Sequence, residues 1–209
     1  MKLYVAAASP FSRKVRIALL EKCIPCEVVV ENPWSTHSAV PRLNPLAKVP
    51  VLELDDGRTI VDSPVIVEYL ETLPYDPRLV PVAPGPRIEH RRLEAIADGI
   101  AEAVSLIAVE RARVPDRQSN DWIARQLAKI GSGVGTLARE LGDGEWFVGE
   151  RYGLADIAIG CMLGHLDARM PELAWRGAAP ALARFAERVF AKPAFEATRA
   201  AGKVIDTAR

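Results

Sequence analysis

Cysteine, net charge and long apolar runs are all scarce in this chain of 209 residues. Its three cysteines are too few to build a disulfide framework. Basic and acidic side chains balance at 27 each, so the chain as a whole has no positive field that would attract nucleic acid or an anionic membrane. No apolar run approaches the roughly 20 residues that span a bilayer, and charge follows the short apolar opening too closely for a signal peptide. We therefore expect a soluble, cytoplasmic protein that binds neither nucleic acid nor membranes.

Histidine is as scarce as cysteine, and neither residue type is spaced as metal ligands are. His37, His90 and His165 are scattered along the chain. Cys23 and Cys26 form a Cys-x-x-Cys sequence, but at the C-terminal end of a predicted helix, where the helix dipole would raise a thiol pKa. We interpret both as packing residues, as we do the third cysteine, and we predict no metal site.

Hydrophobic residues are plentiful, at 49% of the chain, and suffice to bury a core. In the first third, short β-type runs alternate with segments of helical spacing. Ser9 and Pro10 form a helix start, because serine can cap a helix and proline fits its first position. The predicted strands are residues 2–7, 26–31, 51–54 and 59–61, and the predicted helices start at Pro10 and near Val65. This order predicts an α/β domain over residues 1–76.

A cluster of prolines separates this domain from a helical half. Five of the sixteen prolines lie between residues 74 and 86, which predicts a stiff linker at 77–86. Beyond it, apolar residues recur at helical spacing in three stripes. The stripes are Ile96, Ile100, Val104 and Ile107; Ile123, Leu127, Ile130, Val134, Leu137 and Leu141; and Leu182, Phe185, Val189 and Phe190. The predicted fold is thus an α/β domain followed by an all-α domain at 87–209.

Three short motifs follow one another in the first domain: residues 9–16 (SPFSRKVR), residues 43–52 (LNPLAKVPVL) and Asp62-Ser63. In this order and spacing they resemble the amino-terminal domain of the cytosolic glutathione transferase superfamily, in the bacterial type with serine at the activating position. The helical half, with Ala155-Asp156, is similar to the family's second domain. The resemblance implies a thioredoxin-like, glutathione-binding domain and a helical domain that lines the second-substrate site. It also implies glutathione as co-substrate, a small electrophilic substrate and a homodimer.

Ser9 is the residue that the resemblance implies as activator of the glutathione thiol. A free thiol has a pKa of about 8.5, and lowering it to about 6.5 requires ~2.7 kcal/mol of preference for the thiolate. A hydroxyl that donates to the sulfur supplies ~1.5–3 kcal/mol, and the positive end of a helix adds up to ~1–2 kcal/mol. No separate base is needed. The alternatives are that Ser9 is only a helix cap, and that Ser12, one turn on, activates the thiol.

The second motif implies a backbone contact with glutathione. In the family the bond corresponding to Val49-Pro50 is cis, and the main chain of the residue before the proline pairs with the cysteinyl unit of the tripeptide. Lys48 would then neutralise the glycyl carboxylate, with a solvated lysine as the alternative. His37, in the preceding loop, is a weaker candidate for the same end of glutathione.

The third motif is a second helix start, where Asp62 or Ser63 can cap. The resemblance implies that Ser63 and free backbone donors bind the γ-glutamyl carboxylate, while Asp62 pairs with the γ-glutamyl ammonium. Asp98, near the start of the long helix, would reach the same amine across the dimer, or is an ordinary solvated carboxylate. Phe11 is a guess for a wall of the second-substrate pocket.

Asp156 marks a structural signature in the helical half. In the family a serine or threonine cap stands three positions before this aspartate, and here that position is Gly153. A glycine cap costs only a few tenths of a kcal/mol relative to serine. We therefore expect Asp156 to bond back to its own loop without a catalytic role.

Glutathione transfer to an electrophilic, mostly apolar small molecule is the leading predicted function. Glutathione-dependent isomerisation, as in the zeta class, is weakened because that class has Ser-Ser-Cys-Ser where this chain has Ser9-Pro-Phe-Ser12. Glutathione-dependent reduction is a further alternative. A non-catalytic adaptor of the same fold is disfavoured, because adaptors tend to lose the glutathione motifs that this chain keeps.

Overall fold

The computed structural model describes residues 1–199, which form two compact units. One comprises Met1–Val80 together with the described residues from Pro193 onward, and the other comprises Pro81–Lys192. This division differs from the expected domains in two places. The helix that opens the second unit begins at Pro84, inside the expected linker, because proline fits the first turn of a helix. The described residues after Lys192 group with the first unit instead of the helical one.

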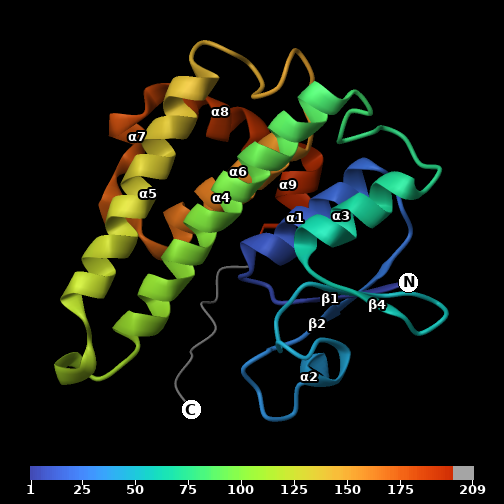
Figure 1. Cartoon of the computed structure of the whole chain (residues 1–209), viewed down its shortest axis with the longest axis horizontal. Coiled ribbons are helices and arrows are strands. Elements are labelled where there is room, and N and C mark those ends of the chain that lie inside the picture. Colours follow the sequence, from blue (N-terminus) through green and yellow to red (C-terminus); the bar gives the residue numbers. More distant parts are fainter. Residues whose placement is uncertain (200–209) are drawn as a thin grey trace. The chain divides into compact units, whose positions relative to one another are not determined.

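The first unit has a thioredoxin-like arrangement of a small mixed sheet and flanking helices (Figure 1). The strand order is β2-β1-β3-β4; β1 is parallel to β2 and antiparallel to β3, and β3 is antiparallel to β4. Two long helices, α1 and α3, pack against each other. The elements are β1 (Lys2–Val5), α1 (Pro10–Glu21), β2 (Glu27–Val30), α2 (Val40–Leu43), β3 (Val51–Glu53), β4 (Thr59–Ile60), α3 (Ser63–Thr72) and α9 (Pro193–Ala197).

The core of the first unit lies between the sheet and the two long helices. Leu3 and Leu52 pair across β1 and β3 and are fully buried, as are Ile17 on α1 and Ile66 on α3. Burial of these side chains is the main force that holds the helices on the sheet. The strands and helices that the sequence predicts here are confirmed within a few residues at each end.

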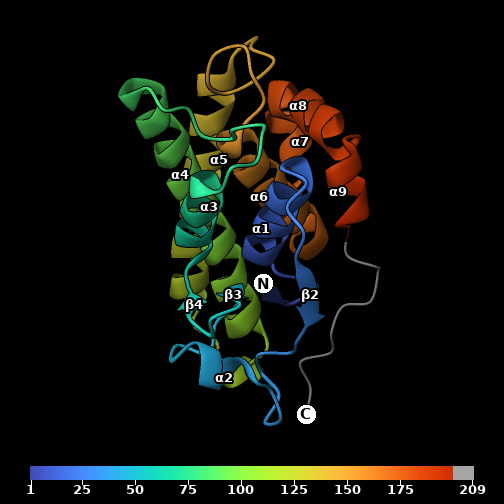
Figure 2. The ribbon, with the colours of Figure 1, turned by 90° about the vertical axis from the view of Figure 1, so that its right-hand side faces the viewer.

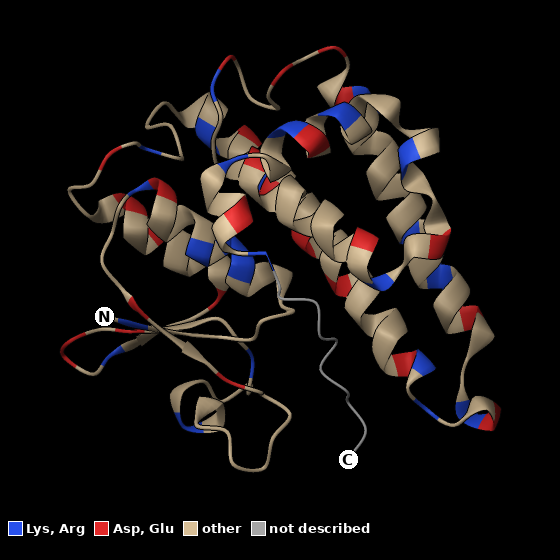
Figure 3. Cartoon of the chain, turned by 180° about the vertical axis from the view of Figure 1, so that it is seen from behind, with Lys and Arg blue, Asp and Glu red and all other residues tan. Residues whose placement is uncertain are grey.

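The second unit is helical throughout its described length, with charged side chains of both signs interspersed along its helices (Figures 2 and 3). Helix α6 is apolar on almost every side and is buried, and α4 packs against both α5 and α6. The elements are α4 (Pro84–Arg111), η1 (Pro115–Arg117), α5 (Asn120–Leu141), α6 (Leu154–Arg169), η2 (Pro171–Leu173), α7 (Trp175–Ala178) and α8 (Pro180–Phe190). None of the helices among residues 1–199 is long and apolar enough to cross a membrane.

One packing prediction is wrong. Cys23 is exposed, in a left-handed backbone conformation just after the C-cap of α1, so it takes no part in a core. Cys26 is half-buried and Cys161 is buried, as expected of packing residues. Burial raises the pKa of the Cys26 thiol, which disfavours its reactive thiolate.

Candidate functional site

Ser9 lies where β1 gives way to α1, and it caps that helix. Its Oγ accepts a hydrogen bond from the backbone N–H of Ser12 at 3.1 Å, which leaves the hydroxyl proton of Ser9 available to a ligand. Ser9 is half-buried, whereas Ser12 is only 1% exposed and its Oγ accepts from the N–H of Ala6 at 3.4 Å. Of the two serines in this motif, Ser9 is therefore the more accessible.

The loop before β3 is held in place by Asn44, a residue that sequence reasoning missed. Its side chain is 3% exposed, donates to the carbonyl of Lys48 at 2.8 Å and accepts from the N–H of Leu46 at 3.0 Å. The bond between Val49 and Pro50 is cis, as the family resemblance implies. The described part of the chain offers the backbone of Val49 no hydrogen-bond partner, and Lys48 is exposed.

Asp62 and Ser63 form the start of α3. Asp62 is the N-cap, and its side chain accepts from the N–H of Ser63. Ser63 is fully buried, and its Oγ has no hydrogen-bond partner among residues 1–199. A buried hydroxyl without a partner costs about 1–3 kcal/mol, and such a group at a helix start is suited to bind an anion.

The sheet register brings the three motifs to one edge. Tyr4 pairs with Val51, so the end of β1 that leads to Ser9 lies beside the start of β3 that follows Val49. Leu52 pairs with Ile60, so the end of β4 that leads to Asp62 lies at the same edge. This edge therefore presents a hydroxyl, a free backbone and a helix start to one ligand.

Comparison with known proteins shows the family of this chain. The chain matches the glutathione S-transferase N-terminal domain over residues 8–73 and the C-terminal domain over residues 120–188. It is 38% identical to an uncharacterized GST-like protein of Escherichia coli, YibF, over 95% of this chain and 98% of the relative. The chain belongs to the glutathione S-transferase family.

Two further relatives in this family have different names. A glutathione S-transferase from Methylobacterium radiotolerans, solved in complex with glutathione sulfonate, is 45% identical, with a TM-score of 0.94 over 100% of this chain and 98% of that one. A maleylacetoacetate isomerase from Pseudomonas aeruginosa is 30% identical over 93% of both chains. Relatives of this chain thus carry transferase and isomerase names.

The remaining predicted site residues are more scattered. His37 is exposed in the loop between β2 and α2, and Phe11 is half-buried in the first turn of α1. Asp98 lies in α4, in the other unit, and its role depends on a second subunit. The roles of all three stay predictions.

The structural signature of the second unit is confirmed. Asp156 is fully buried, and its carboxylate accepts from the N–H groups of Phe147 at 3.0 Å and Gly153 at 2.9 Å. Burial raises its pKa to about 6, against the lowering effect of these bonds. Sequence reasoning missed a second partner of this helix start. The Nδ1 of His90, on α4, accepts from the N–H of Ala155 at 3.1 Å and so supplies the cap that Gly153 lacks.

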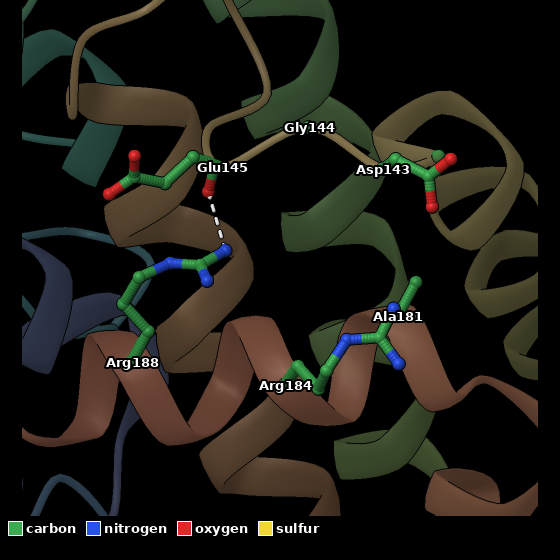
Figure 4. A pocket seen from close by; sticks show the side chains of 7 residues that line it. Asp143, Gly144, Glu145, Ala181, Arg184 and Arg188 are labelled. Carbon is green, nitrogen blue, oxygen red and sulfur yellow. Dashed lines mark hydrogen bonds between the residues drawn. The ribbon is translucent and has the colours of Figure 1, made fainter.

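A small cavity of about 290 Å³ lies elsewhere in the second unit, between α8 and the loop before Trp146 (Figure 4). Arg184 and Arg188 face the loop that contains Asp143 and Glu145. Arg188 donates to the carbonyl of Glu145 at 2.7 Å and lies over the Trp146 ring, so it fastens the loop. The two arginines and the two carboxylates that line this cavity balance in charge, and we assign the cavity no ligand. Residues 1–199 contain no cluster of three or more His, Cys, Asp or Glu side chains that could hold a metal ion.

Proposed function

We propose that this protein is a glutathione transferase that binds glutathione at the sheet edge formed by Ser9, Val49, Asp62 and Ser63. The observation that carries the proposal is the convergence of a free hydroxyl, an unpaired backbone and an unpartnered buried Ser63 Oγ at one edge. Each group matches one part of the tripeptide: the thiol, the cysteinyl backbone and the γ-glutamyl carboxylate. The glutathione sulfonate bound by the relative from Methylobacterium radiotolerans supports this choice of ligand.

Ser9 would stabilise the thiolate, and the glutathione thiolate would then attack an electrophilic, mostly apolar small molecule. The accessible hydroxyl of Ser9 and the burial of Ser12 favour Ser9 as the activating residue. Its location at the start of α1 adds the positive end of a helix to the hydrogen bond. Lys48, exposed beside Val49, would interact with the glycyl carboxylate, and His37 is the second candidate for that role.

Isomerisation is the second candidate reaction, favoured by the identity to a maleylacetoacetate isomerase. Such a reaction uses glutathione as a nucleophile that is released unchanged at the end. The same activated thiolate would serve both reactions, so the second substrate decides between them. Turnover of a model aryl halide and of a cis-dienoic acid, each with glutathione, separates the two.

We also propose a homodimer, with the second copy on the outer side of α4 and α5. A groove of about 670 Å³ runs there, and Ile96, Gly99 and Arg125 are among the residues that line it. Small residues such as Gly99 let a neighbouring helix approach closely. Sedimentation at micromolar protein should give twice the 22.8 kDa mass of one chain, and a monomer would remove Asp98 from the site.

Thermal shift with glutathione tests the ligand. At a concentration 100 times the dissociation constant, glutathione would stabilise the protein by ~2.7 kcal/mol and raise the melting temperature by roughly 5–10 °C. The matched control is the same tripeptide with an ordinary α-linked glutamate, which places the carboxylate and ammonium wrongly for Asp62 and Ser63. No shift at 10 mM glutathione, or equal shifts with both peptides, contradicts the proposed site.

A further inference from the structure

Lys22 and Glu71 form a buried ion pair that the proposed chemistry does not use. Lys22 is the C-cap of α1 and is 0% exposed, and Glu71, on α3, is 5% exposed. Their Nζ and Oε1 atoms are 3.1 Å apart. Burying two charges is costly, and apolar residues of similar volume are often at least as stable, so fold stability alone does not account for such a pair.

The hydrogen bonds of the pair go to the segment that leads to the second unit. Besides Glu71, Lys22 Nζ donates to the carbonyls of Tyr75 at 2.8 Å and Pro77 at 3.1 Å, which uses all three ammonium protons. Glu71 Oε1 also accepts from the backbone N–H of Leu79 at 3.1 Å. A single charged pair thus holds this segment at three backbone positions.

The packing of the same segment agrees with these bonds. Leu79 is 2% exposed and Val80 is fully buried, whereas Val82 is 69% exposed. Helix α4 begins at Pro84. The unanchored part of the connection is therefore residues 81–83, much shorter than the ten residues 77–86 that the proline cluster suggests.

We propose that Lys22 and Glu71 are positioning residues: they clasp residues 75–79 onto the first unit and so fix the point from which the chain leaves it toward α4. Under the proposed function, the glutathione contacts are in the first unit, and the family resemblance implies that the helical unit lines the second-substrate site. Loss of the clasp therefore weakens use of the second substrate and leaves glutathione binding intact. This catalytic part rests on the proposed glutathione transferase function; the clasp itself does not.

Trypsin cleavage after Arg78 tests the clasp without any substrate. Arg78 is exposed, but the next residue, Leu79, is buried and bonded to Glu71, so cleavage requires local release of the segment. Lys22→Met alone leaves the Glu71 charge buried and can unfold the protein, so the decisive variant is Lys22→Met with Glu71→Leu. We expect this double variant to fold, to melt a few degrees below wild type because the buried N–H of Leu79 loses its acceptor, and to be cut after Arg78 about tenfold faster or more. Cleavage after the exposed Arg117, in the second unit, is the internal reference.

Steady-state kinetics tests the positioning. The double variant should bind glutathione with a dissociation constant within twofold of wild type, while KM for an aryl halide rises several-fold. Arg58→Met, which removes the exposed Arg58–Asp56 pair, is the control and should change neither value. Cleavage after Arg78 at the wild-type rate overturns the clasp, and faster cleavage with an unchanged KM overturns its positioning role. If the wild type neither binds glutathione nor turns over the halide, the proposed function fails, while the cleavage result still decides the clasp.

Discussion

The starts of α1 and α6 are both helix N-termini that need a capping group, but the capping residue is accessible at α1 and buried at α6. At α1, Ser9 caps with its own oxygen and remains half-buried, with its hydroxyl proton available. At α6, Gly153 has no side chain to cap with, and two other residues take over. Asp156 binds two backbone N–H groups and His90 binds a third, all in the interior.

This difference shows when a helix start can serve as a binding site. Both ends carry free N–H groups and the positive end of a helix dipole. At α6 the N–H groups of Gly153 and Ala155 are bonded to buried side chains of the protein itself. At α1 and α3 the donors and hydroxyls stay in part without protein partners, as Ser63 Oγ shows. A helix start is thus a candidate binding site only where some of its N–H or hydroxyl groups have no partner within the protein.

Acid should destabilise the α6 region more than any single substitution there. Burial lowers the pKa values of His90 and His165 to about 4. As pH falls from 6.5 toward 4, the unfolded chain therefore binds protons at these histidines while the folded protein does not, which favours unfolding. Asp156, with its pKa raised to about 6, acts in the opposite sense, because protonation relieves the cost of its buried charge. Two losses of about 3 kcal/mol against one gain of similar size leave a net loss of about 3–4 kcal/mol. Urea unfolding at pH 7 and pH 4 measures it; equal stability at both pH values would refute it.

Replacing Asp156 should affect stability alone. Asp156→Ala leaves the N–H groups of Phe147 and Gly153 buried without partners, at about 1–3 kcal/mol each, so we expect a loss of about 3 kcal/mol. The melting temperature should fall by roughly 6–12 °C, as calorimetry would show. Glutathione affinity below the transition should match the wild type. A large change in affinity with an unchanged melting temperature would mean that this helix start is functional.

Replacing Ser9 should give the reverse pattern. Ser9→Ala removes a hydrogen bond of ~1.5–3 kcal/mol to the thiolate, which raises the pKa of bound glutathione by about one to two units. The rate at pH 6.5 should fall tenfold to a hundredfold and recover at high pH, while stability falls by only ~1 kcal/mol. Ser12→Ala is the matched control. Ultraviolet titration of the bound thiolate decides, and an identical titration in wild type and Ser9→Ala would reduce Ser9 to a helix cap.

His90 should give the smallest effect. His90→Leu keeps most of the volume but leaves the N–H of Ala155 unpaired, at a cost of about 1–2 kcal/mol at pH 7. The same variant should lose less stability between pH 7 and pH 4 than the wild type, since one titrating histidine is gone. Denaturant unfolding at both pH values measures this. His37→Leu, at an exposed histidine, should show neither change.

The sequence predicts the local features of this protein well and the long-range ones poorly. The cap by Ser9 and the start of α3 depend on residues within a few positions of each other, and both are present. The cis bond before Pro50 is present too, but the family resemblance implied it and the residues alone did not. The sequence did not reveal the role of Asn44. Asn44 holds the loop because its side chain is buried and bonded to the Lys48 carbonyl, and a single asparagine in a sequence does not indicate burial.

Residues that act across long separations give even less signal. The bond between His90 and Ala155 joins two helices far apart in sequence, and Lys22 and Glu71 likewise meet from the ends of two different helices. Gly153 departs from the family pattern at the cap position, and this departure is the one sign in the sequence that another residue caps α6. A helix start without a capping side chain thus predicts that a hydrogen-bond acceptor from another part of the chain binds its N–H groups. The sequence does not identify that residue.

The return of α9 to the first unit has a consequence for synthesis on the ribosome. Arg13, on α1, donates to the carbonyl of Phe195 at 2.9 Å and lies over its ring, and Phe195 is fully buried. The strands and helices of the first unit therefore emerge early, but one side of α1 stays uncovered until the whole helical unit has been translated. The first unit is thus completed only after α9 has been translated, later than the helical unit that precedes it in the chain.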